Sequence, residues 1–243
     1  MQPPSTQPPK PVSSEVHPEI TRLPALTRSR LFFRRLMRAI ARLLVSGLGR
    51  PQVNGLENYP HEGAALLVTN HLGDADAAMA LAFFPVLPDT LAKAELYTFP
   101  VLGKVMETFG VIWIHRGRPD RRAIRTALQG LQEGRLVAIA PEGRESATGS
   151  LEEGTSGAAY LALKAGVPVV PITFTGTSNA QVFGALKRLR RPVMTLTVGP
   201  SFFLTELPDR KESLEQGTRQ IMQALARQLP PEYQGAYRLQ PGD

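Results

Sequence analysis

Short apolar runs of strand length alternate along this chain with segments of helical pattern, and polar residues follow directly after several of the runs. Four runs occupy residues 64–69, 111–114, 136–140 and 167–172, and helices are expected over residues 77–84, 123–131 and 158–166. Strands that are apolar on both faces are typical of parallel sheets covered by helices. The pattern predicts an α/β fold with a mixed, mostly parallel sheet flanked by helices, closed by a strand over residues 193–199 and a C-terminal helix.

The turn after the first apolar run has the sequence Asn70-His71-Leu72-Gly73-Asp74-Ala75-Asp76. It places His71 at the carboxyl end of a buried strand, which is the edge of an open α/β sheet where ligands bind. A helix that begins at Asp74 would bring the carboxylate of Asp76 back to the imidazole and hold one tautomer. Because an oriented imidazole can act as a general base, His71 and Asp76 are the predicted catalytic residues.

The spacing of His71 and Asp76, with three further blocks between residues 53 and 200, resembles the glycerolipid acyltransferases, the family of 1-acylglycerol-3-phosphate acyltransferases. The further blocks are Gly110-Val111-Ile112-Trp113-Ile114-His115-Arg116, Pro141-Glu142-Gly143-Arg144-Glu145-Ser146 and Val167-Pro168-Val169-Val170-Pro171-Ile172. The resemblance implies a phospholipid/glycerol acyltransferase domain that moves a fatty acyl group from an acyl thioester to a hydroxyl group in phospholipid synthesis.

The resemblance also implies which residues bind the acceptor. It assigns the acceptor phosphate to Arg116, whose planar guanidinium suits bidentate contact with phosphate, and it assigns acceptor binding to Glu142 and Gly143. The family usually has Phe-Pro-Glu-Gly-Thr-Arg in the third block, so Arg144 is expected to substitute for the displaced arginine. His115 is expected to be a neighbour of the site. The remaining predicted substrate-binding residues are Asn70 and Pro171, and no metal ligand is predicted.

The sequence leaves the identities of the acyl acceptor and the acyl donor open. The predicted acceptor is 1-acylglycerol-3-phosphate, but the altered third block also allows a non-phosphorylated or aminolipid acceptor. The donor is expected to be an acyl-CoA or an acyl carrier protein thioester, and no cofactor is expected. A different class of function follows from Asp74-Ala75-Asp76, because metal-dependent transferases hold a divalent ion with such paired carboxylates.

A basic segment precedes the predicted domain. The net charge is +7, and the segment from Arg28 to Arg50 holds seven arginines and no acidic residue, so it carries the whole formal excess. On a helix, the apolar face comprises Phe33, Leu36, Met37, Ile40, Leu43 and Leu44, and the basic face comprises Arg34, Arg35, Arg38 and Arg42. This pattern is typical of a helix that lies in a membrane surface. The alternative is a helix that packs on the domain and leaves its basic face in solvent.

Other features complete the predicted organisation. Residues 1–27 contain seven prolines and are predicted to be a disordered tail, residues 28–50 the membrane-surface helix, residues 51–231 the acyltransferase domain and residues 232–243 a C-terminal tail. The absence of cysteine excludes disulfides and thiolate nucleophiles. No uncharged apolar stretch reaches the roughly 18 residues of a spanning helix.

The charge distribution bears on partners and location. A second basic cluster, Lys187, Arg188, Arg190 and Arg191, could face phospholipid, coenzyme A phosphates, an acidic carrier protein or solvent. Aromatic residues form only 7% of the chain and do not interleave with the basic clusters, so no nucleic-acid partner is expected. We expect a peripheral protein on the cytoplasmic side of the cell membrane, with an anionic membrane surface as its partner.

Overall fold

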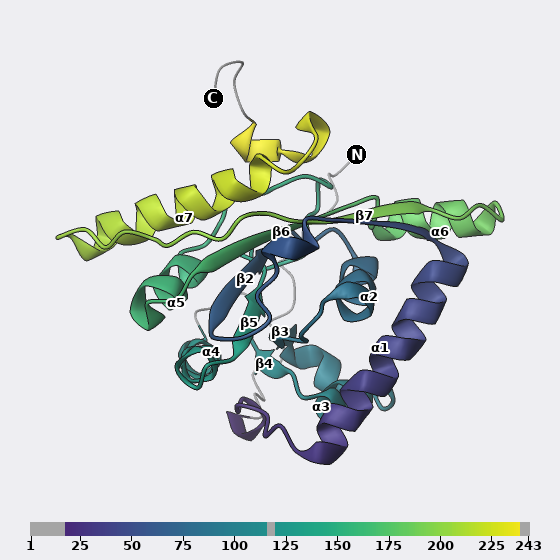
Figure 1. The fold of residues 1–243 in the computed structure, drawn as a ribbon, viewed down its shortest axis with the longest axis horizontal. Helices are drawn as coiled ribbons and strands as arrows, with labels where there is room; N and C mark the ends of the chain where they lie inside the picture. Colours follow the sequence, from purple (N-terminus) through teal and green to yellow (C-terminus); the bar gives the residue numbers. More distant parts are fainter. Residues whose placement is uncertain (1–17, 116–119, 239–243) are drawn as a thin grey trace, which may run out of the picture.

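The computed structural model describes residues 18–115 and 120–238. The helices are α1 (Arg28–Leu48), α2 (Asp74–Phe83), α3 (Leu102–Phe109), α4 (Arg121–Gln132), α5 (Gly157–Ala165), α6 (Asn179–Lys187) and α7 (Arg210–Ala226). The strands are β1 (Arg50–Asn54), β2 (Ala65–Thr69), β3 (Asp89–Lys93), β4 (Ile112–Ile114), β5 (Leu136–Ile139), β6 (Val169–Thr175) and β7 (Val193–Val198). Figure 1 shows their arrangement around a central sheet.

The strands form one seven-stranded sheet in the order β1-β7-β6-β2-β5-β3-β4. Strands β6, β2, β5, β3 and β4 run parallel to one another, whereas β7 pairs antiparallel with β6 and parallel with β1. The predicted mixed, mostly parallel sheet is therefore confirmed. The register pairs Val68 of β2 with Ile139 of β5 and Thr69 with Ile172 of β6. The carboxyl ends of these three neighbouring strands consequently share one edge of the sheet.

Alternate side chains of the central strands belong to two hydrophobic cores on opposite faces of the sheet. Leu66 and Val68 pack with residues of α4, α5 and α7 on one face, while Leu67 packs with residues of α1 and α2 on the other. Figure 1 shows these two groups of helices on opposite sides of the sheet. This period-two division explains why the sequence of β2 is apolar throughout, since both of its faces are covered.

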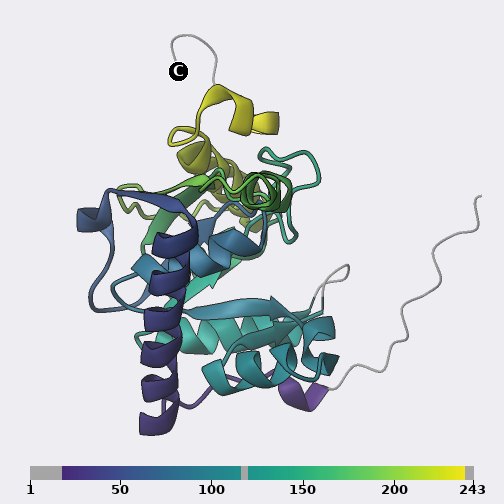
Figure 2. The same cartoon turned by 90° about the vertical axis from the view of Figure 1, so that its right-hand side faces the viewer.

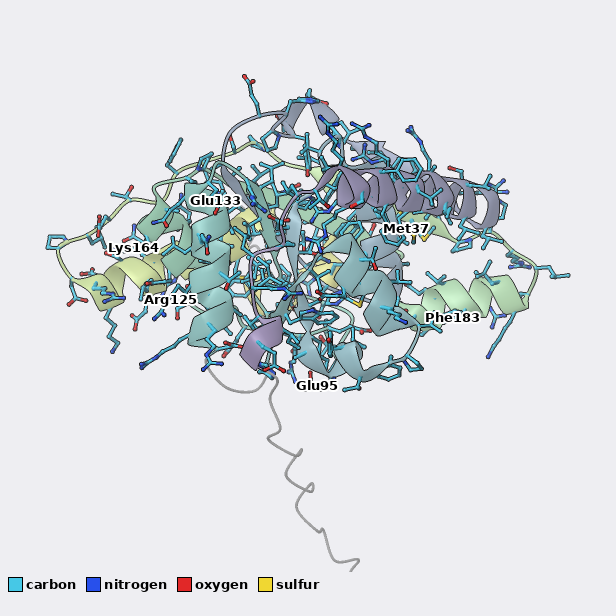
Figure 3. All side chains as sticks on the ribbon, turned by 90° about the horizontal axis from the view of Figure 1, so that it is seen from below. Met37, Glu95, Arg125, Glu133, Lys164 and Phe183 are labelled. Atoms are coloured by element: carbon cyan, nitrogen blue, oxygen red, sulfur yellow. The ribbon has the colours of Figure 1, made fainter. Side chains whose placement is uncertain are left out.

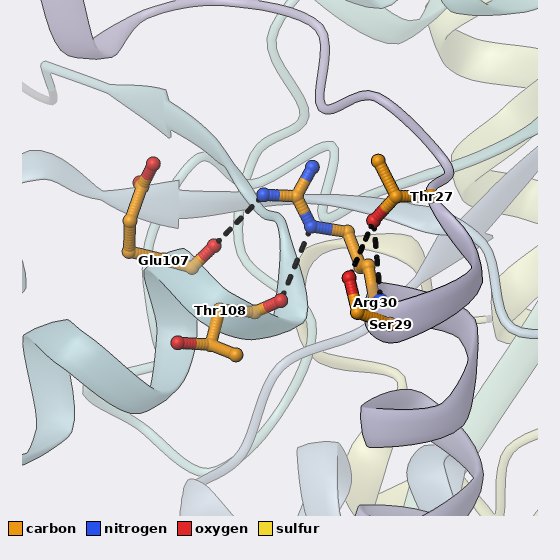
Figure 4. A pocket seen from close by; sticks show the side chains of 5 residues that line it. All are labelled: Thr27, Ser29, Arg30, Glu107 and Thr108. Carbon is orange, nitrogen blue, oxygen red and sulfur yellow. Dashed lines mark hydrogen bonds between the residues drawn. The ribbon is translucent and has the colours of Figure 1, made fainter.

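Helix α1 is attached to the domain through its arginines. The side chain of Arg34 is buried, at 4% exposure, and its guanidinium donates to a carboxylate oxygen of Asp89 at 2.8 Å and to the carbonyl oxygens of Phe109 and Gly110. One turn earlier, Arg30 donates to main-chain carbonyl oxygens of α3 beside a shallow hollow of about 310 Å³ (Figure 4). Arginine matches this surface because the C-terminal end of α3 presents free carbonyl oxygens.

The outward side of α1 carries an apolar ridge, and Arg28, Arg35 and Arg42 are exposed as well. Its outermost ridge includes Phe32 and Leu43, which are 68% and 74% exposed, together with Leu36. The prediction of an N-terminal amphipathic helix is confirmed. As in the alternative interpretation, α1 packs on the domain, but its basic residues divide: Arg34 and Arg38 bind the domain, whereas Arg35 and Arg42 are exposed. Within the described ranges, no helix has both the length and the apolar composition needed to cross a bilayer.

Residues within both predicted tails contact the rest of the domain. Within the predicted tail over residues 1–27, Ile20 is buried and the hydroxyl group of Thr21 donates to the carbonyl oxygen of Trp113 at 3.1 Å. Residues 1–17 of that tail lie outside the described residues. Within the predicted tail over residues 232–243, the carbonyl oxygen of Tyr233 accepts a hydrogen bond from the main-chain N–H of Leu151. The domain boundaries themselves stay predictions.

Candidate active site

The catalytic pair predicted from the sequence meets where β2 ends and α2 begins. Nδ1 of His71 lies 2.9 Å from Oδ2 of Asp76, and the same oxygen accepts hydrogen bonds from the main-chain N–H groups of Leu72 and Gly73 at 2.6 and 3.0 Å. An ionised carboxylate can only accept, so Nδ1 of His71 carries the proton of this contact. Nε2 therefore keeps its lone pair, as a general base requires.

Helix α6 follows β6, the strand beside β2 in the sheet, and its first residue contacts this turn. A Cβ atom on Gly73 would lie 2.9 Å from the main-chain nitrogen and Oδ1 of Asn179 and from the carbonyl oxygen of Thr177, so only glycine fits. Oδ1 of Asn179 accepts from the main-chain N–H of Asp74 at 3.1 Å, and its Nδ2 donates to Oδ2 of Asp74 at 3.2 Å. Asn179 thus caps the start of α2 from outside the helix. No sequence motif singles out Asn179 for this position.

The two carboxylates of the Asp74-Ala75-Asp76 sequence have separate partners. The carboxylate of Asp74 accepts from Asn179, whereas Oδ2 of Asp76 accepts from His71 and from two main-chain N–H groups. Across residues 18–115 and 120–238, no group of three or more His, Asp or Glu side chains is placed to hold a metal ion. The described residues therefore offer the metal-dependent alternative no converging set of ligands.

Asn70 is buried between β2 and β6. Its Nδ2 donates to the carbonyl oxygen of Phe174 at 2.9 Å, and its Oδ1 accepts from the N–H of Phe174 at 2.8 Å. The side-chain amide thereby continues the pairing of the two strands beyond Thr69. This contact fixes the backbone immediately before His71, and the prediction that Asn70 also binds substrate stays a prediction.

Glu142 lies beside the catalytic pair at the carboxyl end of β5. Its Oε2 accepts from the main-chain N–H of Glu152 at 2.9 Å, and its Oε1 is buried without a hydrogen-bond partner among the described residues. Burial raises the pKa of the Glu142 carboxyl to about 7, although the N–H of Glu152 and the nearby His71 favour the ionised form. A buried carboxylate oxygen usually has a hydrogen-bond partner, so Oε1 keeps the capacity to accept one more bond. The prediction that Glu142 binds the acceptor stays a prediction.

Gly143 and Arg144 form the turn that follows. Gly143 has φ +73°, a conformation that glycine adopts without strain, and its N–H bonds to the carbonyl oxygen of Ala140. The exposed guanidinium of Arg144 pairs with the carboxylate of Glu152, and its Nε donates at 2.9 Å. The same loop touches the catalytic turn, since the N–H of Ser146 donates to the carbonyl oxygen of His71 at 2.8 Å.

Pro171 and Arg116 are the other two residues predicted to bind substrate. Pro171 is buried within β6 opposite Val68, and its carbonyl oxygen accepts from the N–H of Gly199. The structure therefore places Pro171 in the middle of the sheet and not beside His71. Arg116 lies outside the described residues, so its assignment to the acceptor phosphate stays a prediction.

A second histidine and aspartate repeat the same spacing at the end of β4. Nδ1 of His115 lies 2.9 Å from Oδ2 of Asp120, which also accepts from the main-chain N–H of His115. Although burial opposes ionisation, main-chain N–H groups of His115 and Ala123 keep the pKa of Asp120 below its usual value. Two strands, β5 and β3, separate this pair from His71 in the sheet. Asp120 also caps α4, which gives the second pair a structural purpose.

The chain matches known proteins over its central part. A family model described as Acyltransferase matches residues 50–175. The 1-acyl-sn-glycerol-3-phosphate acyltransferase of Borreliella burgdorferi is 30% identical, covering 52% of this chain and 52% of the relative. The protein of the same name from Pseudomonas aeruginosa is 33% identical, covering 53% of this chain and 50% of the relative. The chain thus spans about half the length of these relatives.

A solved structure extends the comparison of the fold. The 1-acyl-sn-glycerophosphate (LPA) acyltransferase PlsC from Thermotoga maritima has a TM-score of 0.61 and 20% sequence identity, covering 83% of this chain and 84% of that protein. At this identity the likeness shows that the two proteins share a fold. Residues 50–175 contain both members of the catalytic pair and Glu142, whereas α6 and α7 lie beyond the matched range.

Proposed function

We propose that this chain, which belongs to the acyltransferase family, moves a fatty acyl group from an acyl thioester to a hydroxyl group of a glycerolipid acceptor. The observation that carries the proposal is the contact of His71 Nδ1 with a carboxylate that main-chain N–H groups hold in place. The names of the two bacterial relatives favour 1-acylglycerol-3-phosphate as the acceptor.

The proposed reaction needs one proton transfer in each direction. Nε2 of His71 takes the proton from the acceptor hydroxyl as its oxygen attacks the thioester carbonyl carbon. The tetrahedral intermediate collapses, the carbon–sulfur bond breaks, and the departing sulfur receives the proton from the imidazolium. Asp76 keeps the ring in one orientation throughout and stabilises its transient positive charge. The products are the acylated glycerolipid and a free thiol.

Glu142 would position the acceptor in this scheme. Oε1 of Glu142 has no hydrogen-bond partner among the described residues. The loop that follows Glu142 contacts the catalytic turn, because the N–H of Ser146 donates to the carbonyl oxygen of His71. A hydrogen bond from a second acceptor group to Oε1 would hold the reacting hydroxyl at the imidazole, where orientation contributes to rate. Burial raises the pKa of Glu142, and a substrate group that donates this hydrogen bond would lower it by favouring the ionised carboxylate.

The exposed ridge of α1 supports a position on a membrane surface. A soluble surface rarely carries so many large apolar side chains on one helix. Deleting residues 1–50 is a poor test, because it would leave Asp89 without Arg34. Leu43→Ser is the better change, since Leu43 makes no part of the buried face. A smaller fraction of this variant should sediment with anionic vesicles. Unchanged binding would contradict a membrane contact of α1.

The acceptor and the reaction can be tested together. Thiol release from an acyl-CoA is measured with lysophosphatidate, monoacylglycerol or an aminolipid as acceptor, and the lipid product is identified. The proposal expects acceptor-dependent thiol release and an acylated lipid, with lysophosphatidate used best. Acyl carrier protein thioesters are compared in parallel to identify the donor. Thiol release that does not depend on any acceptor would indicate hydrolysis and contradict the transferase assignment.

A further inference from the structure

The turn between α6 and β7 exposes a leucine that the fold does not need. Leu189 is 97% exposed and has φ +54°, and no other described residue except glycine has a positive φ. Its N–H bonds to the carbonyl oxygen of Leu186, and the N–H of Arg190 bonds to that of Ala185. This is the helix ending whose left-handed position glycine usually occupies. A leucine there is strained and gains no packing, which points to a role outside the folded domain.

The residues around Leu189 are basic and largely free. Lys187, Arg188 and Arg190 are exposed, and none of the described carboxylates lies within ion-pair distance of them. The turn therefore combines one protruding apolar side chain with three available positive charges. An anionic lipid surface matches both properties, since it accepts apolar groups between head groups and attracts cations.

Arg191 attaches this turn to the C-terminal end of α1. Its guanidinium donates to the carbonyl oxygens of Ser46 and Gly49, the latter through Nε at 3.0 Å. A cation at this end of a helix is favoured by the free carbonyl groups and the helix dipole. Figure 2 shows α1 and α6 on the side of the molecule that faces the viewer. The second basic cluster is thus joined to the C-terminal end of the helix that carries the first.

We propose that residues 187–191 form a second lipid contact, in which Leu189 enters an anionic membrane surface beside the exposed ridge of α1. This inference extends the proposed membrane-surface function to a segment outside the range matched by the family model. Helix α6 connects the two functions, because its first residue, Asn179, holds the catalytic turn while its last residue, Lys187, begins the lipid contact.

The proposed lipid contact of residues 187–191 would orient the domain on the membrane surface. Two separated contacts, α1 and the 187–191 turn, fix the rotation of the domain on a surface, which one helix alone would leave free. Figure 3 shows α1, labelled at Met37, and α6, labelled at Phe183, on one side of the molecule, with Lys164 on α5 on the other. The catalytic turn contacts the inner end of α6, so a domain held in this way would keep its site in a constant relation to the lipid acceptor.

The test is binding of the full chain to vesicles of phosphatidylglycerol and phosphatidylcholine, measured without substrate. Leu189→Gly should weaken binding about tenfold, the loss expected when one leucine no longer enters an apolar phase. The same change should raise the melting temperature by about 2–4 °C, because glycine relieves the left-handed strain. Arg188→Glu should also weaken binding and lower its dependence on salt.

Two matched variants control for charge and apolar surface. Lys164→Glu makes the same change in net charge on the opposite side, and Phe203→Ser removes an exposed aromatic ring next to the strand bridge at the amino end of β6. Neither should alter vesicle binding. Leu189→Trp gives a second readout, because its indole emission should shift to the blue when anionic vesicles are added, while the buried Trp113 contributes a constant background.

The outcomes separate this inference from the proposed chemistry. Equal vesicle binding by the wild type and Leu189→Gly, or no shift in Leu189→Trp, overturns the lipid contact and leaves the role of α1 intact. Loss of binding in Arg188→Glu alone indicates a purely ionic contact, with an acidic protein for example, and also overturns the insertion. A wild type that binds no vesicles refutes both membrane claims. Acyl transfer to a water-soluble, short-chain acceptor tests His71 independently of all three results.

Discussion

Replacing Glu142 by Gln should change how the stability of the protein depends on pH. Burial raises the pKa of this carboxyl from 4.5 to about 7, so between these values the folded protein binds a proton that the unfolded chain has released. The free energy of unfolding of the wild type therefore falls as the pH rises through this window. For a shift of this size, linkage gives a loss of about 2.5 kcal/mol between pH 5 and pH 8.

Glutamine retains the acceptor for the N–H of Glu152 but cannot ionise. Its NH₂ group would occupy the unpartnered position of Oε1 and cost about 1–3 kcal/mol at every pH. The informative quantity is therefore the difference between the two proteins at each pH. Urea titrations at pH 5 and pH 8 should show the variant gaining about 2.5 kcal/mol relative to the wild type. A difference that is constant between the two pH values would refute the raised pKa.

The remaining predictions concern α1, the acceptor and metals. Arg34→Ala should lower the free energy of unfolding by about 3–5 kcal/mol in urea, because Asp89 stays buried without its main partner, and a loss below about 1 kcal/mol would show that the pair is not desolvated. Arg116→Ala should raise KM for lysophosphatidate about 10- to 150-fold, and Lys should recover only part; an equal rise for monoacylglycerol would contradict phosphate binding. A chelator should leave the transfer rate unchanged, and a loss restored by a divalent ion would favour the metal-dependent alternative.

The catalytic pair was accessible from the sequence because its geometry is local. Only four residues separate His71 from Asp76, and a strand end followed by a helix start leaves few ways to place them. The α/β class was accessible for a similar reason, since apolar runs on both faces require helical covers. Glu142 was identified only through a resemblance, because its burial depends on the loop that returns through Glu152.

Features that depend on distant contacts were not predictable. The composition of α1 shows two faces, but only the carbonyl oxygens of Phe109 and Gly110 and the carboxylate of Asp89 determine that Arg34 turns inward. Arg35 and Arg42, from the same predicted basic face, stay exposed. Asn179 lies in a stretch rich in Gly, Ser and Thr that reads as a loop. Its capping of Asp74 follows from the pairing of β6 with β2, which places the start of α6 beside the catalytic turn.

The most direct test of the catalytic role is the rate of acyl transfer by His71→Ala at saturating acyl thioester and acceptor, with thermal melts in parallel. We expect kcat to fall about 10²–10⁴-fold with an unchanged melting temperature. Asp76→Asn should lose less, because the amide oxygen can still accept from the same N–H groups. His115→Ala, which breaks the other contact of the same spacing, should keep most of kcat. If His71→Ala retains more than about a tenth of the wild-type rate, general base catalysis by this imidazole is contradicted.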